Sequence, residues 1–346
     1  MIYNHIKKIS VILFIWLGLA FPGLLFAGNG ADKCLDTLIY QGIEMVHRER
    51  IDEALTIFKK IIEKDEESPV GYFYIAALYE VLMQNYKTRV FSKEFDYYVS
   101  KAIKLGEELV RKEKNNAWAY FYLGGAYGYR AIDKSETGNW FGAFLDASKG
   151  ADNLENALAI NPELFDAYYG FGVYKYWRSV KSKSLWFLPF FDDERRMGIN
   201  EIKMAISYGK YSKVTAKSAL IGIYYNEKEY YKALAVIDEI LCDYPHDIHA
   251  MKMKAVIFND LSRKEEAVLL FEKISERLQN SRWKETGVAL EVQYYLALIH
   301  YEQNRVSEYK ENCEKLARMK KALKKEEKSE AINELLHRVA FITTQG

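Results

Sequence analysis

Residues 251–275, MKMKAVIFNDLSRKEEAVLLFEKIS, decide the fold of the whole chain. A small residue, Ala255, is followed three positions later by Phe258, and twelve residues after Ala255 comes Ala267, followed in turn by Phe271. Apolar residues at spacings of three and four are typical of amphipathic helices. The stretch therefore predicts two helices joined by a short turn, with small residues where their backbones approach each other.

The same pattern occurs at least twice more toward the N-terminus. One copy consists of Gly222, Tyr225, Ala233 and Ile237, and a weaker one of Gly42, Met45, Ala54 and Phe58. Ala233 and Ala267 are 34 residues apart, which is the repeat length of tetratricopeptide proteins. The chain thus resembles the tetratricopeptide repeat family. The resemblance implies an all-α fold, a right-handed α-solenoid of antiparallel helix pairs.

Helical periodicity continues through nearly the whole chain, and the strict alternation that marks strands is almost absent. We predict helices at 32–48, 51–65, 68–84, 91–114, 116–133, 138–160, 164–178, 193–208, 213–226, 229–243, 246–260, 262–278, 284–303, 306–322 and 326–342. Within a solenoid covering residues 28–346, irregular central repeats are expected at about 116–208, regular repeats at about 213–278 and capping helices at about 284–342.

The centre departs from the regular period in two ways. Between Gly124 and Pro162 there are extra residues, which predict a lengthened helix pair around 135–140. An apolar insertion follows at 179–193 and includes Trp186. Asp192 or Asp193 is expected to cap the next helix. The segment at about 178–208 also resembles a tetratricopeptide family tied to inclusion-body clearance.

The N-terminus has the organisation of a secretory signal. Lys7 and Lys8 precede an uncharged apolar run from Ile9 to Phe26, and Ala27 offers a small residue for cleavage. Residues 1–27 are therefore expected to be a signal peptide, and the mature chain to be periplasmic or associated with the cell envelope. An uncleaved anchor is the alternative, since about 18 apolar residues can span a bilayer.

The charge balance argues against nucleic acid as a partner. The chain has 49 basic and 48 acidic residues, and loss of Lys7 and Lys8 with the signal leaves 47 basic residues against 48 acidic ones. Binding to nucleic acid needs a basic surplus on one face. The cysteines, Cys34, Cys242 and Cys313, are too few for a disulfide framework, and the last two are expected to be small buried hydrophobes.

Motifs for catalysis, metals and cofactors are not found, so the chain is not expected to be an enzyme. His246 and His249, with Asp247, have a spacing that could bind metal, but Asp247 is better explained as an acidic residue at the N-terminus of a helix and the histidines as exposed polar residues. Gly124 and Gly172 lie inside predicted helices, where close packing explains them better than a phosphate loop. The carboxylates at 192–194 are likewise attributed to capping rather than to catalysis.

Aromatic residues make up 15% of the chain, and some are expected to anchor a partner on the concave face. The candidate binding residues are Tyr122, Tyr169, Tyr176, Trp177, Arg178 and Trp186. The leading hypothesis is an exported scaffold for a protein or peptide in the envelope. The alternatives are a small-molecule or lipid pocket beside the 179–193 insertion, and membrane contact through that insertion or an uncleaved signal.

Overall fold

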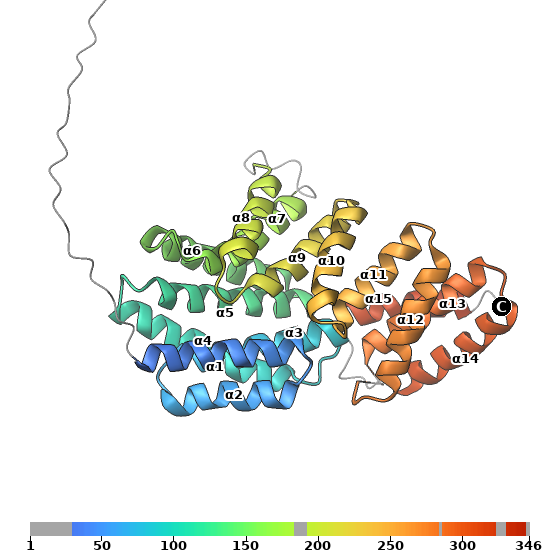
Figure 1. The fold of residues 1–346 in the computed structure, drawn as a ribbon, viewed down its shortest axis with the longest axis horizontal. Coiled ribbons are helices and arrows are strands. Elements are labelled where there is room, and N and C mark those ends of the chain that lie inside the picture. Colours follow the sequence, from blue (N-terminus) through green and yellow to red (C-terminus); the bar gives the residue numbers. More distant parts are fainter. Residues whose placement is uncertain (1–29, 183–191, 284–285, 323–329, 344–346) are drawn as a thin grey trace, which may run out of the picture.

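The computed structural model describes residues 30–182, 192–283, 286–322 and 330–343, and in these ranges the regular secondary structure is entirely helical (Figure 1). The helices are α1 (Gly30–His47), α2 (Ile51–Lys64), α3 (Pro69–Tyr86), α4 (Ser92–Lys112), α5 (Ala117–Glu136), α6 (Trp140–Ile160), α7 (Phe165–Ser182), α8 (Arg195–Tyr208), α9 (Lys213–Asn226), α10 (Tyr230–Asp243), α11 (Ile248–Asp260), α12 (Lys264–Gln279), α13 (Gly287–Glu302), α14 (Val306–Ala322) and α15 (Glu330–Thr343).

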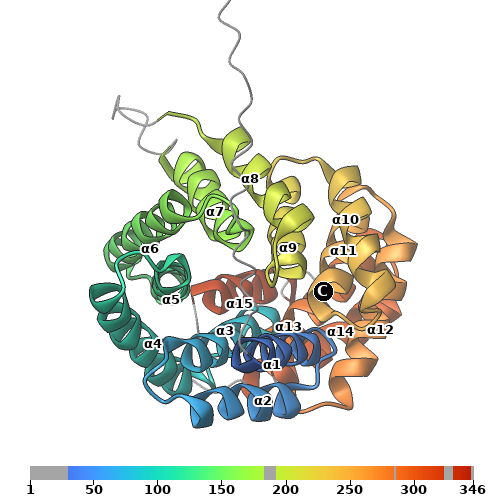
Figure 2. The same cartoon turned by 60° about the vertical axis from the view of Figure 1, so that its left-hand side comes forward.

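The predicted all-α solenoid is confirmed, and each predicted helix has a counterpart with ends within a few residues. Consecutive helices pack against each other along the chain, as expected when each pair buries its apolar face on the next. Viewed from one end, the helices follow one another around a ring, with α4, α6, α8, α10 and α12 toward the outside (Figure 2). None of the described helices is both long and apolar enough to cross a bilayer.

The central helix pairs approach each other closely through glycines. The lengthened pair is present, since α5 has 20 residues and α6 has 21, against 13 and 16 in α11 and α12. In the next pair, α7 and α8, a Cβ added to Gly172 would lie 2.5 Å from the carbonyl oxygen of Gly198. A side chain there would force the two backbones apart. Close helix packing is therefore confirmed as the role of Gly172.

The ring closes on itself because the end of α3 meets α13 and the segment before it. The rings of Tyr86 and Trp283 are stacked with centroids 4.2 Å apart. The Gly287 amide donates to the carbonyl oxygen of Lys87 at 3.2 Å. The carboxylate of Glu291 accepts from Lys87 Nζ at 2.7 Å and from Lys252 Nζ of α11 at 2.8 Å. Burial alone would raise the pKa of Glu291, but the two lysines lower it to about 2.

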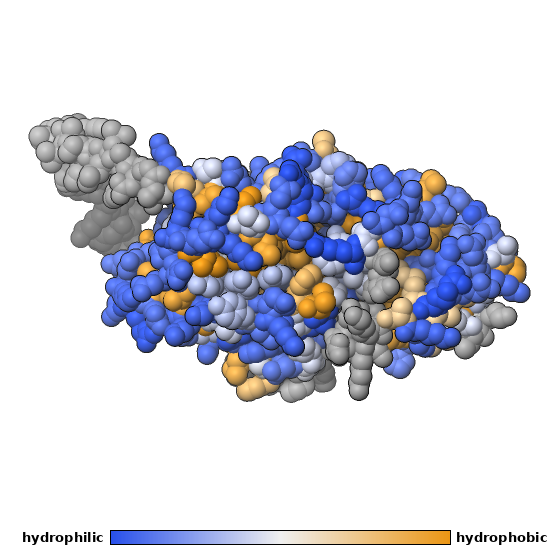
Figure 3. All heavy atoms as spheres, turned by 90° about the horizontal axis from the view of Figure 1, so that it is seen from below, coloured by the Kyte–Doolittle hydropathy of each residue, from blue (hydrophilic) through white to orange (hydrophobic). Residues whose placement is uncertain are grey.

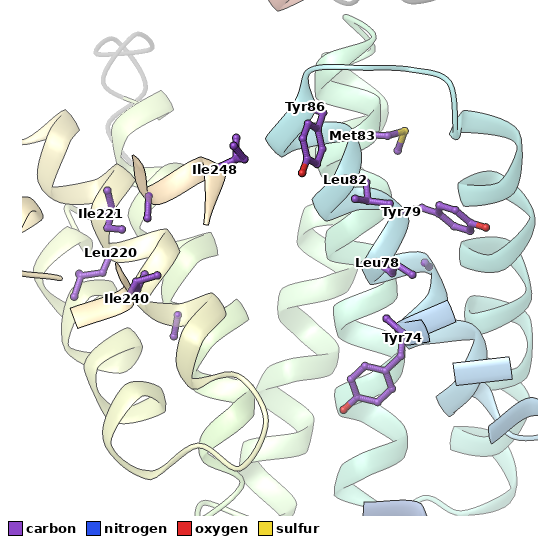
Figure 4. Packing of buried hydrophobic residues seen from close by; sticks show 14 of the residues in the cluster. Tyr74, Leu78, Tyr79, Leu82, Met83, Tyr86, Leu220, Ile221, Ile240 and Ile248 are labelled. Atoms are coloured by element: carbon purple, nitrogen blue, oxygen red, sulfur yellow. The ribbon is translucent and has the colours of Figure 1, made fainter. Parts of the chain in front are cut away.

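The hydrophobic core runs through α3, of which 14 of 18 residues are buried. Figure 4 shows side chains leaving α3 in different directions, among them Tyr74, Tyr79 and Tyr86, with residues of α9 to α11 beside them. A helix buried on all sides must be apolar all round. The sequence PVGYFYIAALYEVLMQNY of α3 meets this condition, with Glu80 as its one charged residue.

The cysteines correct one expectation from the sequence. All three are free, and Cys242 is exposed rather than buried, while Cys313 is partly buried. The buried residues of α10 are Ala233, Leu234, Ile237 and Ile240. Cys242 lies two positions after Ile240, which turns its side chain by about 200° to the other side of the helix.

Candidate functional site

Several large apolar side chains at the start of α6 are exposed to solvent. The exposed fractions are 53% for Trp140, 75% for Phe141, 53% for Phe144 and 45% for Leu145. Asn139 caps the helix by accepting from the Gly142 amide at 3.0 Å. The buried residues of α6 are small or lie on its other side, so these four side chains project outward together. Contiguous apolar surface of this kind marks interaction sites.

A buried ion-pair network holds this end of α6 against α5. The carboxylate of Asp146, 3% exposed as a residue, contacts Arg130 Nε at 2.7 Å and Lys134 Nζ at 2.6 Å. Burial raises the pKa of Asp146, but the bonds from the two cations outweigh burial and lower it below its usual value. The exposed aromatic side chains therefore stand on a helix whose orientation is fixed by charged hydrogen bonds.

The exposed surface continues onto the end of α7. Lys181 Nζ lies 5.2 Å from the centroid of the Trp140 ring, a cation–π distance. Trp177, one turn before Lys181, is 37% exposed, and its ring meets Tyr176 edge-on. We call the group formed by Trp140, Phe141, Phe144, Leu145 and Trp177 the α6 patch. By contrast, the face of the molecule in Figure 3 is mainly hydrophilic, with apolar residues in small groups.

Of the described residues expected to bind a partner, the structure brings only Trp177 to the α6 patch. Tyr122 and Tyr176 are buried in the core, at 6% and 0% exposure, which corrects the expectation that they present their rings on a surface. Tyr169 is partly buried. Arg178 pairs with Glu194, and Trp186 lies outside the described residues. A part for these residues in binding stays a prediction.

The Tyr176 hydroxyl shows why a polar tip does not indicate exposure. It donates to Glu227 at 2.9 Å and accepts from Asn226 at 2.7 Å, so it is satisfied inside the protein. Burial raises the pKa of Tyr176 to about 12. This tyrosine links α7 to the end of α9.

The acidic residue expected at the start of α11 is found there, whereas the predicted cap of α8 is corrected. Asp247 caps α11, with its carboxylate accepting from the Ala250 amide at 2.8 Å. At α8 the N-cap is Glu194, and Asp193 instead binds the Arg195 guanidinium and amide. His246 is exposed as expected, but His249 is partly buried, and burial lowers its pKa to about 4. Among the described residues, no His, Cys, Asp and Glu side chains are grouped so that they could hold a metal ion.

A cavity of about 870 Å³ lies where the ring closes, between the α1–α2 turn, the start of α11 and the end of α12. Its lining is strongly charged and includes Arg50, Asp52, Lys273 and Arg277, with Tyr86 and Trp283 beside them. A second cavity, of about 450 Å³, lies between α10, α11 and α12. Residues 179–182 and 192–193 line neither cavity. The rest of the 179–193 insertion, beside which a ligand pocket was the alternative expectation, lies outside the described residues.

Comparisons with known proteins show similarity of fold. No family model and no curated protein matches the chain. Among solved structures, the Cut9–Hcn1 assembly of the APC/C gives a TM-score of 0.56 at 13% identity over 92% of this chain and 55% of that chain. A tetratricopeptide repeat protein of Parabacteroides merdae gives 0.42 at 14% identity, over 89% and 99% of the two chains.

A thermophilic tetratricopeptide repeat protein of Thermus thermophilus gives a TM-score of 0.41 at 18% identity, over 64% of this chain and 97% of that one. Identities this low support likeness of fold alone. The chain therefore has the fold of tetratricopeptide-type helical-repeat solenoids, as its small-residue and aromatic pattern predicts.

Proposed function

We propose that this chain, a solenoid with the tetratricopeptide fold, is a non-catalytic scaffold of the cell envelope that holds a protein or peptide partner on the α6 patch. The observation that carries the proposal is the exposure of Trp140, Phe141, Phe144 and Leu145 at 45–75% on two consecutive turns of one helix. Partner binding removes such side chains from water, which supplies the driving force for association.

The composition of the α6 patch fits a protein partner. Binding energy at protein interfaces is concentrated in a few aromatic anchors, and Trp is prominent among them. Aromatic rings also lose little side-chain entropy when they become fixed, because only two torsion angles are restricted. The matching partner surface is an apolar helix face or an extended apolar segment, with a carboxylate placed to meet Lys181.

The aromatic side chains of α3 leave little room for a partner inside this part of the ring. Phe73, Tyr74 and Tyr122 contact one another there, and Tyr211 packs against Tyr74 at a centroid distance of 6.3 Å. The proposed binding surface is therefore on the outside of the solenoid, on α6, rather than among the rings expected from the sequence.

Placement in the envelope is part of the proposal and is supported by residues 1–27, whose basic start, apolar run and Ala27 match a secretory signal. Expression in a bacterium with cell fractionation and intact-mass measurement tests it. A mature chain that begins at Gly28 in the periplasm is expected, and an unprocessed chain in the cytoplasm would contradict the placement.

Co-purification from the envelope fraction followed by mass spectrometry tests partner binding. The Phe141→Ser/Phe144→Ser double variant should lose a partner that wild type retains, with at least a tenfold fall in recovery, because two anchors of about 1–2 kcal/mol each are removed. Tyr231→Ser is the matched control, since Tyr231 is 75% exposed like Phe141 but lies on α10. Equal recovery with all three proteins would exclude the α6 patch as the binding surface.

A further inference from the structure

The N-terminal helix presents carboxylates to the second half of the ring, where each finds hydrogen-bond donors. Asp36 contacts Lys210 Nζ at 2.6 Å and accepts from the Tyr211 hydroxyl. Glu44 accepts from the Tyr244 hydroxyl at 2.9 Å. In the turn after α1, Glu49 contacts the Arg277 guanidinium at 2.5 Å. These contacts join residues 174 to 228 positions apart.

The opposing side consists of donors, namely Lys210, Tyr211, Tyr244 and Arg277, which we call the clasp surface. Lys and Arg side chains can only donate, and each tyrosine donates its proton to a carboxylate here. The donors come from the α8–α9 turn, the end of α10 and α12. These four donors are complementary to a helix that carries carboxylates.

The part of the clasp surface that carries Lys210 and Tyr211 is held in place independently of α1. The carboxylate of Asp166, at the start of α7, accepts from the backbone amides of Lys210, Tyr211 and Ser212 at 2.7–2.8 Å. These bonds fix the turn that carries the Lys210 and Tyr211 side chains. The backbone of Lys210 and Tyr211 would therefore keep its position if α1 moved away.

Toward the clasp surface, α1 is held mainly by polar contacts. Its apolar side packs elsewhere: Ile39 and Gly42 are buried, and Gly42 packs on Phe58 of the neighbouring α2. The partly buried apolar residues of α1 that pack against the core are Leu35, Leu38, Ile43, Met45 and Val46. Toward the second half it relies on the carboxylate contacts and on two ring contacts, Tyr40 with Tyr211 and His47 with Tyr244. Polar contacts between partly exposed side chains each contribute about 1 kcal/mol or less, so a competing helix needs little free energy to replace them.

We infer that the clasp surface is a binding site for an acidic helix of a partner protein, and that α1 occupies this site in the present structure. Asp36, Tyr40 and Glu44 stand at positions i, i+4 and i+8, which fall on one side of a helix and span about 12 Å. The expected partner helix carries carboxylates at i and i+8 and an aromatic residue at i+4. Its binding displaces α1.

A peptide with the sequence of residues 30–48, fluorescently labelled, serves as the probe, and anisotropy measures its binding to the full chain. Wild type should bind it weakly because α1 competes. The Asp36→Asn/Glu44→Gln variant, whose own helix is released more easily, should bind it about tenfold more tightly, since apparent affinity rises with the fraction of open surface. No gain in a variant that keeps the wild-type circular dichroism spectrum overturns the inference.

Receptor-side substitutions make the test specific. In the double variant, Tyr244→Phe should weaken peptide binding about fivefold, because one hydrogen bond to a carboxylate is lost. Tyr225→Phe is the matched control: the Tyr225 hydroxyl also donates to a carboxylate, Asp260, at 2.8 Å, but outside the clasp surface. Equal losses for both substitutions would contradict the site.

Two further measurements distinguish the clasp surface from the α6 patch and from an exchange of α1 between two copies of the chain. The Phe141→Ser/Phe144→Ser variant should bind the peptide as wild type does, so failure of the α6 patch as a partner site leaves the clasp surface untouched. Concentration-dependent dimerisation of the Asp36→Asn/Glu44→Gln variant without peptide would overturn the inference in favour of such an exchange.

Discussion

α1 and α3 are both first helices of a pair, and both reach across the ring to its second half, but they do so by different means. α3 uses the Tyr86–Trp283 stack and a helix surface that is buried on nearly all sides. α1 uses carboxylates and the rings of Tyr40 and His47, and fewer of its residues are fully buried than in α3. The contrast indicates that α3 closes the ring and supplies stability, whereas α1 supplies recognition at low energetic cost.

The largest expected effect comes from breaking the ring stack at α3. Trp283→Ala should lower the free energy of unfolding by about 3–5 kcal/mol, the usual cost of removing a buried Trp side chain. Tyr40→Ala removes the corresponding ring from the α1 contact with Tyr211, but Tyr40 is 48% exposed, so the loss should stay below about 1 kcal/mol. Urea unfolding measures both, and equal losses would contradict the contrast.

The single charged residue of α3 should make stability fall as the pH rises. Burial raises the pKa of Glu80 from 4.5 to about 8, with the nearby Asp133 adding to the rise and a bond from Gln84 opposing it. The folded chain therefore keeps a proton that the unfolded chain releases above pH 4.5. The stability contributed by protonated Glu80 is complete below pH 4.5 and is lost as the pH rises through 8.

Glu80→Gln sharpens this expectation, because the amide cannot ionise. Between pH 5 and pH 8.5 wild type should lose on the order of a few kcal/mol that the variant keeps, as followed by denaturant midpoints. Glu44 on α1 is the opposite case: burial raises its pKa, but the Tyr244 and Arg48 bonds outweigh it and lower the pKa. The stability that Glu44 contributes is present above pH 4.5 and is lost on acidification. The two carboxyls therefore change stability in opposite directions as the pH rises.

The smallest effect is expected from Glu44→Gln, which weakens one hydrogen bond of α1. The free energy of unfolding should fall by about 1 kcal/mol or less. Hydrogen exchange should nevertheless become faster in α1 and stay unchanged in α3, since local opening of a weakly packed helix does not need global unfolding. Equal acceleration in both helices would show that α1 and α3 open together.

The fold could be predicted from the sequence because its determinants are local. Small residues such as Gly42, Ala54 and Ala233 recur at helical and repeat spacings, and each helix pair packs mainly on its neighbours. Closure of the ring could not be predicted in this way. Lys87 and Glu291 are 204 positions apart, and no local pattern connects them.

The surface was harder to predict for a physical reason. In a solenoid each helix contacts neighbours on more than one side. The spacing of apolar residues therefore does not tell whether a ring such as Tyr122 or Tyr176 faces the core or the solvent, and both are buried. The signal for the α6 patch was present in residues 140–145, WFGAFL, which hold more large apolar residues than one buried stripe requires.

Ring closure also sets the order in which the chain can acquire its native contacts. Tyr86 contacts Trp283, and Glu49 contacts Arg277, so the first residue of each contact is synthesised about 200 residues before its partner. At 5–20 residues per second this interval is roughly 10 to 40 s. During it the nascent α3 lacks its closing partners and exposes aromatic surface. A chain of this design gains from a factor that shields α3 until α13 has emerged.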